Sequence, residues 1–157
     1  MKIGVISDSH GDKYSIDRAI FYLKQCDIIY HLGDTCDDVN YLAKKINIPI
    51  KGVAGNCDRV KNGIEELVEE VGKIRILLTH GHNYGVYYNT FKLRLKALEA
   101  NCNIVLYGHT HVGKIEEEEG IYYINPGSTS EPRGGTSRSI AIIEVIDNKI
   151  NPQIINI

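Results

Sequence analysis

Short apolar runs alternate with segments of helical spacing through the first half of the chain. Strands are predicted at Ile3–Ile6, Ile28–Tyr30 and Ile50–Val53. The segments between these strands repeat apolar residues at helical intervals, first at Ile16, Ala19, Ile20 and Leu23, then at Val39, Leu42, Ala43 and Ile46. Alternation of this kind predicts βαβ units and a largely parallel sheet.

The second half of the chain is richer in strand patterns. Two strands are predicted over Glu65–Val71 and Lys73–Thr79, followed by a buried strand at Ile104–Tyr107. A helix is predicted over Tyr87–Ala100, with one face formed by Phe91, Leu95 and Leu98. We therefore expect two sheets packed together, with helices outside them.

From Val112 onward the pattern predicts β-hairpins. The charged run Glu116–Glu119 is read as a solvated turn, and the last hairpin turns at Asp147 and Asn148. Pro152 marks the final strand as an edge. The hydrophobic C-terminal segment Ile154–Ile157 could pair with another strand edge, so a homo-oligomer is an option.

A short turn bearing Asp, Asn or His follows each of five apolar strands. These turns are Asp8-Ser9-His10, Gly33-Asp34, Gly55-Asn56-Cys57-Asp58, His80-Gly81-His82 and Gly108-His109-Thr110-His111. Because ligands bind at the carboxyl ends of strands in open α/β sheets, the turns should converge on one place. In an extended segment residues two apart point the same way, so each Asp-x-His or His-x-His pair could face one site.

The converging groups are carboxylates, a carboxamide and imidazoles: Asp8, His10, Asp34, Asn56, His80, His109 and His111. Seven such groups exceed what one tetrahedral zinc needs, and they suit two divalent cations that share a bridging carboxylate. This mix of oxygen and imidazole ligands without sulfur favours such cations over a soft metal; we expect Mn²⁺, with Ni²⁺, Fe²⁺, Co²⁺ or Zn²⁺ as alternatives. Each turn alone could be a helix cap or a tight turn, including one with Asn56 in the left-handed conformation. His31 reads equally as support for the site or as a packed core histidine.

Composition narrows the function further. The chain has 157 residues and a formal net charge of −2, which suits one domain over residues 1–157. That charge argues against stable nucleic-acid binding through a broad basic surface. We identify no targeting segment or membrane span, and read the four cysteines as reduced thiols of a cytoplasmic protein.

The five turns together resemble the signature of the calcineurin-like metallophosphoesterases, and the chain looks like their small prokaryotic phosphodiesterase subgroup. The resemblance implies a four-layer α/β/β/α sandwich of two mixed sheets. It also implies that Asp8, His10 and His111 bind one metal, that Asn56, His80 and His109 bind a second, and that Asp34 bridges both. The implied activity is hydrolysis of small phosphodiesters by a hydroxide held between the two metals.

One position departs from the family pattern. Many members carry His directly after the Gly-Asn pair, where this chain has Cys57. A thiol is a poor substitute for imidazole as a leaving-group acid at neutral pH. Asp58, His82 or a metal-bound water could take that role, or the enzyme prefers leaving groups that need little help. Asn56 is a candidate phosphate contact, and Arg133 is either a phosphate clamp or part of a surface ion pair. The alternatives are a phosphomonoesterase of the same fold and a non-catalytic protein-interaction scaffold.

Overall fold

Two five-stranded sheets form the centre of the computed structural model, which describes residues 1–35, 37–58 and 63–157. The first sheet has the strand order β10 (Lys149–Asn156), β9 (Ser139–Ile146), β1 (Lys2–Ile6), β2 (Ile28–His31), β3 (Ile50–Gly52). The second has the order β4 (Glu66–Val71), β5 (Ile74–Thr79), β6 (Ile104–Leu106), β8 (Ile121–Pro126), β7 (Gly113–Glu118). Both sheets are mixed, because parallel central strands are flanked by antiparallel ones.

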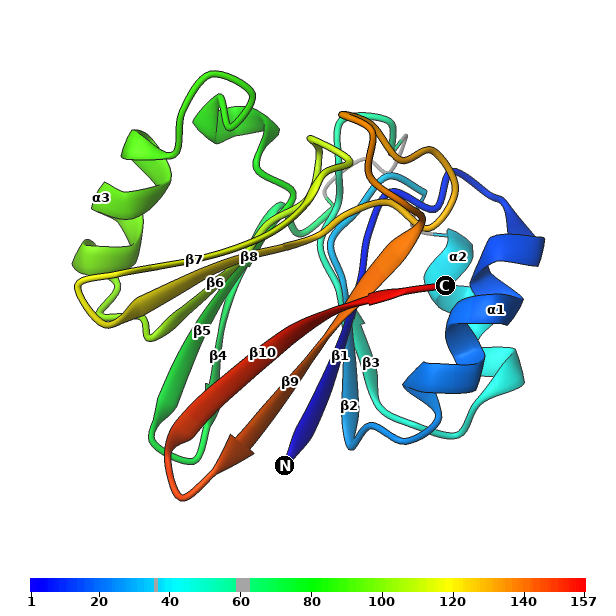
Figure 1. Cartoon of the computed structure of the whole chain (residues 1–157), viewed down its shortest axis with the longest axis horizontal. Helices are drawn as coiled ribbons and strands as arrows, with labels where there is room; N and C mark the ends of the chain where they lie inside the picture. Colours follow the sequence, from blue (N-terminus) through cyan, green and yellow to red (C-terminus); the bar gives the residue numbers. More distant parts are fainter. Residues whose placement is uncertain (36, 59–62) are drawn as a thin grey trace.

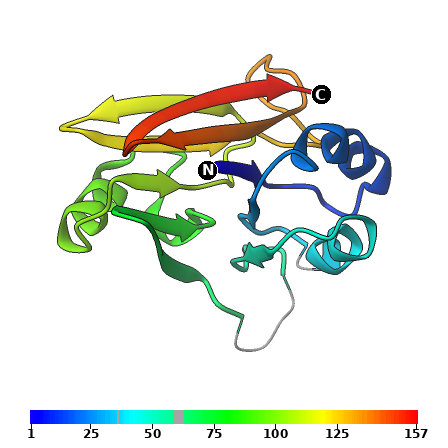
Figure 2. The same ribbon diagram turned by 90° about the horizontal axis from the view of Figure 1, so that it is seen from below.

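The helices lie on the outer faces of the two sheets (Figures 1 and 2). The first sheet is covered by α1 (Lys13–Leu23) and α2 (Asp37–Lys45), and the second by α3 (Phe91–Glu99). A short 3₁₀ helix, η1 (His82–Tyr84), precedes α3. This arrangement confirms the four-layer α/β/β/α sandwich of two mixed sheets.

The central strands are buried on both faces, which explains their continuous apolar sequences. In β1, Ile3 and Val5 enter the core between the sheets, whereas Ile6 packs under α1 and α2. In β6, Ile104 and Leu106 enter the same central core, and Val105 packs under α3. The paired sheets therefore hold their strand ends in fixed relative positions, at the place where the polar turns lie.

The helix predicted over Tyr87–Ala100 was placed too early and its apolar face was wrong. The observed α3 begins at Phe91, whose N–H is bound by the Asn89 side chain, and it buries Leu93 and Ala97 against the second sheet. Phe91, Leu95 and Leu98 are exposed. Leu93 and Ala97 follow helical spacing, as Phe91, Leu95 and Leu98 do. The second sheet packs against the face that Leu93 and Ala97 form.

The last strand, β10, lies at the edge of the first sheet, as Pro152 predicted. The β9–β10 turn is left-handed at Asp147 and Asn148, with φ values of 50° and 63°, a geometry typical of tight hairpins. Pairing of this edge with a second copy stays a prediction, as does the single-domain assignment. Within the described ranges no helix has the length and apolar character needed to cross a bilayer.

Candidate metal centre

The polar turns meet at one end of the molecule, the upper end in Figure 1, where the carboxyl ends of β1, β2, β5 and β6 come together. The first sheet contributes four of the seven predicted ligands and the second sheet three. These are Asp8, His10, Asp34 and Asn56 from the first, and His80, His109 and His111 from the second. The site therefore exists only where the two sheets are packed together.

Four of these side chains form a compact group. His111 Nε2 lies 3.2 Å from Asp8 Oδ1 and 3.3 Å from His10 Nε2. His10 Nε2 is 3.9 Å from Asp34 Oδ2. Two ligands bound at about 2.1 Å to one tetrahedral metal are about 3.4 Å apart, so these separations suit a single cation.

A second group lies on the other side of Asp34. His80 Nε2 is 3.1 Å from Asn56 Oδ1 and 3.4 Å from Asp34 Oδ1. The ring of His109 packs edge-on against the ring of His80, with centroids 5.0 Å apart. The two oxygens of Asp34 thus face histidines of different groups.

The donor set fits a metal because its lone pairs face one another. The Nδ1–H groups of His80 and His111 each donate to a backbone carbonyl at 2.7 Å, which leaves the Nε2 atoms as acceptors. Both Nε2 atoms face oxygens that are also acceptors. Asp8 Oδ1 is buried and accepts no hydrogen bond within the described residues. Buried acceptors that converge in this way need a positive charge between them.

The electrostatics of the site agree with this reading. Burial alone would raise the pKa of Asp8 and of Asp34, but the facing imidazoles of His111 and His80 respectively, together with further hydrogen bonds to the two carboxylates, outweigh burial and hold both pKa values below the usual range. Burial lowers the pKa of His80, yet the Asp34 and Asp8 carboxylates outweigh burial and raise it. The same balance, with Asp8, raises the pKa of His111. The site therefore carries two anionic carboxylates and favours bound positive charge.

The backbone at the predicted ligands is left-handed, not extended as the sequence reading assumed. The φ values are 53° at Asp8, 47° at His10, 57° at Asp34, 69° at His109 and 61° at His111. The strands end before these residues, at Ile6 and Leu106, and the chain then turns sharply. Such conformations cost on the order of 1 kcal/mol or more each and gather at functional sites. Asn56 is not among the left-handed residues.

Asp8 is held in place by groups that the sequence reading did not assign to the site. Its Oδ2 accepts hydrogen bonds from Ser7 Oγ at 2.5 Å and from the His109 N–H at 3.0 Å. Its carbonyl oxygen accepts from Ser128 Oγ at 2.7 Å and Ser130 Oγ at 3.0 Å. With Oδ2 occupied, Oδ1 is left facing His111. In the sequence, Ser128 belongs to an Asn-Pro-Gly-Ser segment at residues 125–128, and this segment alone does not predict a role for it in the site.

Buried Asn125 fixes the turn that carries His109. Its Nδ2 donates to the Gly108 carbonyl at 2.8 Å and to Thr110 Oγ1 at 3.1 Å. Its Oδ1 accepts the Gly127 N–H at 2.9 Å. The first two bonds join the turn after β6 to the end of β8 and the third holds the Asn125 side chain in place, so the two histidines of that turn are positioned from the second sheet.

Asp58 joins two of the ligand turns. Its Oδ2 accepts the N–H groups of Asp34 at 3.0 Å and Gly55 at 2.7 Å, and its Oδ1 accepts that of Thr35 at 2.9 Å. Thr35 has a φ of 94°, which is rare for a β-branched residue and is stabilised by this bond. The geometry therefore gives Asp58 a positioning role; its predicted role as a leaving-group acid is untested, and these bonds do not favour it.

His31 is a fully buried histidine in a hydrogen-bonded chain. Its Nδ1 accepts the Gly33 N–H at 3.2 Å, so its Nε2 donates to Ser9 Oγ at 3.0 Å. Ser9 Oγ donates in turn to Asp38 Oδ2 at 2.6 Å. This series of hydrogen bonds links the turns after β1 and β2 to α2. His31 is therefore both a packed core histidine and a support for the site.

The remaining candidates lie around the rim of the site. His82 packs against the His80 and His109 rings, with centroids 5.4 and 6.1 Å apart, and its buried Nδ1 has no partner within the described residues. Arg133 is exposed, donates its backbone N–H to the His111 carbonyl, and donates from its guanidinium to the Tyr87 hydroxyl. Cys57 donates its N–H to Asp34 Oδ1 at 2.9 Å, and loss of solvent together with Asp34 raises the pKa of its thiol to about 11.

Comparison with known proteins shows which family the chain resembles. The model of the calcineurin-like phosphoesterase superfamily domain matches residues 1–148. A probable metallophosphoesterase, YsnB of Bacillus subtilis, is 32% identical over 144 residues, which cover 91% of this chain and 83% of the relative. The phosphodiesterase YfcE of Escherichia coli is 28% identical over 170 residues, covering 92% of this chain and 88% of the relative.

Solved structures agree. A predicted phosphoesterase from Streptococcus pneumoniae superposes with a TM-score of 0.84 at 34% identity, over 99% of this chain and 88% of that one. The family is metal-dependent, and the grouped Asp8, His10, Asp34 and His111 form a possible metal site. The chain therefore belongs to the calcineurin-like phosphoesterase superfamily and is a phosphoric ester hydrolase.

Proposed function

We propose that the chain is a phosphodiesterase that hydrolyses small phosphodiesters at a centre of two divalent cations, with Mn²⁺ the preferred metal. The observation that carries the proposal is the position of Asp34, whose Oδ2 faces His10 at 3.9 Å and whose Oδ1 faces His80 at 3.4 Å. One carboxylate between two groups of nitrogen and oxygen donors is the arrangement that a pair of bridged cations needs.

The seven ligands divide between the two cations. The first would be held by Asp8, His10 and His111, the second by Asn56, His80 and His109, with Asp34 between them. Bound divalent cations supply Lewis acidity toward phosphoryl oxygens and lower the pKa of a coordinated water. The donor set of carboxylate, carboxamide and imidazole without sulfur also suits Ni²⁺, Fe²⁺, Co²⁺ or Zn²⁺.

The substrate would be oriented by groups on the rim. His82 lies beside the second group, where its partly exposed imidazole can contact a substrate oxygen. Arg133, held by Tyr87 and by the His111 carbonyl, can turn its guanidinium toward a phosphoryl oxygen. Asn56 is exposed and adds a carboxamide at the same place.

The activity test is hydrolysis of bis(p-nitrophenyl) phosphate by the metal-free protein and by protein supplied with each of the five metals. We expect turnover only with metal, greatest with Mn²⁺, and its loss on addition of EDTA. Turnover that persists after chelation, or none with any metal, would overturn the proposal.

A substitution at Cys57 distinguishes the proposed phosphodiesterase from the phosphomonoesterase alternative. Cys57 is exposed beside Asn56, next to where a leaving group would depart. Replacement Cys57→His would place an imidazole there, and general acids contribute about 100-fold or more when well placed. We expect the ratio of p-nitrophenyl monoester to diester turnover to rise, as measured by steady-state kinetics with both substrates.

Cys57→Ser is the matched variant, because it changes the sulfur without adding a titratable group. It should leave the monoester-to-diester ratio close to that of the native protein. A Cys57→His ratio equal to that of Cys57→Ser would show that position 57 does not limit monoester hydrolysis.

We also place this activity in a reducing compartment such as the cytoplasm. Support comes from Cys26, Cys57 and Cys102, which are free thiols; Cys36 lies outside the described residues. The small substrate agrees with the net charge of −2, because the positive charge at the site would come from metal and not from a broad basic surface.

A further inference from the structure

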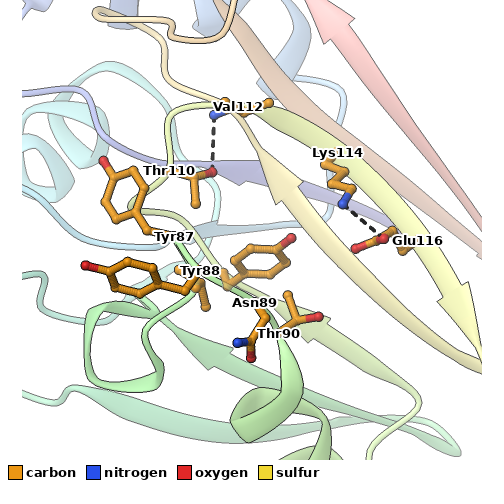
Figure 3. A pocket seen from close by; sticks show the side chains of 10 residues that line it. Tyr87, Tyr88, Asn89, Thr90, Thr110, Val112, Lys114 and Glu116 are labelled. Carbon is orange, nitrogen blue, oxygen red and sulfur yellow. Dashed lines mark hydrogen bonds and ion pairs between the residues drawn. The ribbon is translucent and has the colours of Figure 1, made fainter.

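A pocket of about 320 Å³ lies beside the metal centre, between the segment before α3 and the start of β7 (Figure 3). Asn89 and Thr90 form one side, Thr110 and Val112 the opposite side, and the tyrosines of residues 87–88 lie between them. Its volume is at the lower end of the range for pockets that hold small organic ligands.

The pocket adjoins the candidate metal centre through two of its lining residues, Tyr87 and Thr110. Tyr87 packs edge-on against His109, with ring centroids 4.6 Å apart and an interplanar angle of 71°. Thr110, another lining residue, stands between His109 and His111 in the sequence. A phosphoryl group at the metal centre would therefore have its attached alcohol within reach of this pocket.

The lining carries no net charge. Its only charged residues, Lys114 and Glu116, form an ion pair of 3.0 Å. The other polar groups are hydroxyls and one carboxamide, from Tyr, Thr and Asn side chains. A second phosphate or a carboxylate would find no unpaired positive charge among the lining residues, and the Arg133 guanidinium on the Tyr87 hydroxyl is already assigned to the phosphoryl group, so the lining favours an uncharged group.

The aromatic part of the lining decides which uncharged group fits. Tyr88 is 92% exposed and Tyr87 is 50% exposed, so large ring surfaces are open to a ligand. Stacking of a planar ring on such a surface contributes to binding without a demand for specific hydrogen bonds. Small flexible alcohols cannot use this contact.

We propose that this pocket binds a planar ring carried by the phosphate ester, as in an aryl or nucleoside ester, and that Tyr88 is the residue that selects for the ring. The proposal rests on the proposed function, because the phosphoryl group must be held at the metal centre. Asn89 and Thr90 would then lie near the ring edge, where the hydroxyl and amide groups can contact a heteroatom.

The test is calorimetric titration of the Mn²⁺-loaded protein with benzylphosphonate, ethylphosphonate and inorganic phosphate, none of which it can turn over as esters. We expect benzylphosphonate to bind about tenfold more tightly than ethylphosphonate in the native protein, as one stacked ring allows. Tyr88→Ala should reduce that preference to less than about threefold, because the stacking surface is lost. Its affinity for inorganic phosphate should stay within about twofold, because phosphate carries no ring.

Phe21→Ala is the matched control, since it removes a ring that is 61% exposed on α1, outside the pocket. It should keep the native preference. Adenosine 5′-monophosphate, titrated in parallel, distinguishes the two sources of the ring: tighter binding than benzylphosphonate indicates a nucleoside, and equal or weaker binding an aryl alcohol.

Equal affinity for benzyl- and ethylphosphonate in the native protein would overturn the ring pocket, as would a preference that survives Tyr88→Ala. Both of these outcomes leave the proposed function intact, because phosphate and phosphonates still bind. Failure of every phosphorus ligand to bind in the presence of Mn²⁺ would instead overturn the proposed function, and the ring pocket with it.

Discussion

Asp34→Asn should lower phosphodiester turnover more than about 100-fold, because changes outside the ligand shell already cost 10- to 100-fold at metal sites. The substitution keeps the size of the side chain and one carbonyl oxygen. It removes the negative charge that lies between His10 and His80, at 3.9 and 3.4 Å. Steady-state kinetics and metal analysis of the purified protein measure the effect, and we expect fewer bound cations per chain.

Asp147→Asn is the matched control for this change. It removes the same charge in the β9–β10 turn, at the end of the sheet opposite to the metal centre (Figure 1). Asparagine tolerates the left-handed φ of 50° at that position, so turnover and metal content should both stay native. Native turnover in Asp34→Asn would exclude Asp34 as the bridging ligand.

Gly108→Ala should impair the site as severely as the loss of a ligand, although Gly108 has no side chain to offer a metal. A Cβ at this position would lie 2.1 Å from Ser7 Oγ and 2.8 Å from Asp8 Oδ2. Asp8 and Ser7 are buried and hydrogen-bonded to each other, so the new methyl group must displace the Asp8 carboxylate. We expect loss of metal and turnover, together with a fall of about 1–3 kcal/mol in the free energy of unfolding measured with urea.

Gly72→Ala separates the effect on the site from a general loss of stability. Gly72 lies in the β4–β5 turn with a φ of 61°, and a Cβ there would have no neighbour within 4 Å. Alanine should cost about 1 kcal/mol of folding free energy through the left-handed conformation alone, with native turnover. If Gly108→Ala retained native metal content, the close approach at Asp8 would not be needed for the site.

Periodicity and turn position predicted much of the site from the sequence. The runs around β1, β2, β5 and β6 are predictable because strands buried on both faces are largely apolar, and β3, an edge strand, is predictable from the apolar residues around Lys51. Placement of the polar turns at the carboxyl ends of those strands then followed from the topology of parallel sheets. Glycines stand beside several ligands in the sequence. At Gly108 the structure explains why the residue is glycine, because a side chain there would collide with Asp8.

The parts that escaped prediction depend on tertiary contacts. Asp58 reads like a leaving-group acid in the sequence, but its carboxylate binds backbone N–H groups of two turns that only the fold brings together. The left-handed backbone at Asp8 and His111 could not be located from the sequence, because Asp and His are enriched in that conformation but adopt it at only a minority of positions. For α3, two faces share the helical period, so the sequence could not decide which of them meets the sheet.

The order of strands has a consequence for biosynthesis. β1 is made first, yet its neighbour on one side is β9, which ends at Ile146, and the Asp8 carbonyl is bound by Ser128 and Ser130. Contacts this distant in the sequence form late, because the ribosome adds about 5–20 residues per second and the intervening chain must be made first. A nascent chain that ends before β9 therefore presents Asp8 and His10 on an unfinished sheet, and the Asp8 carbonyl gains both serine partners only when synthesis has passed residue 130.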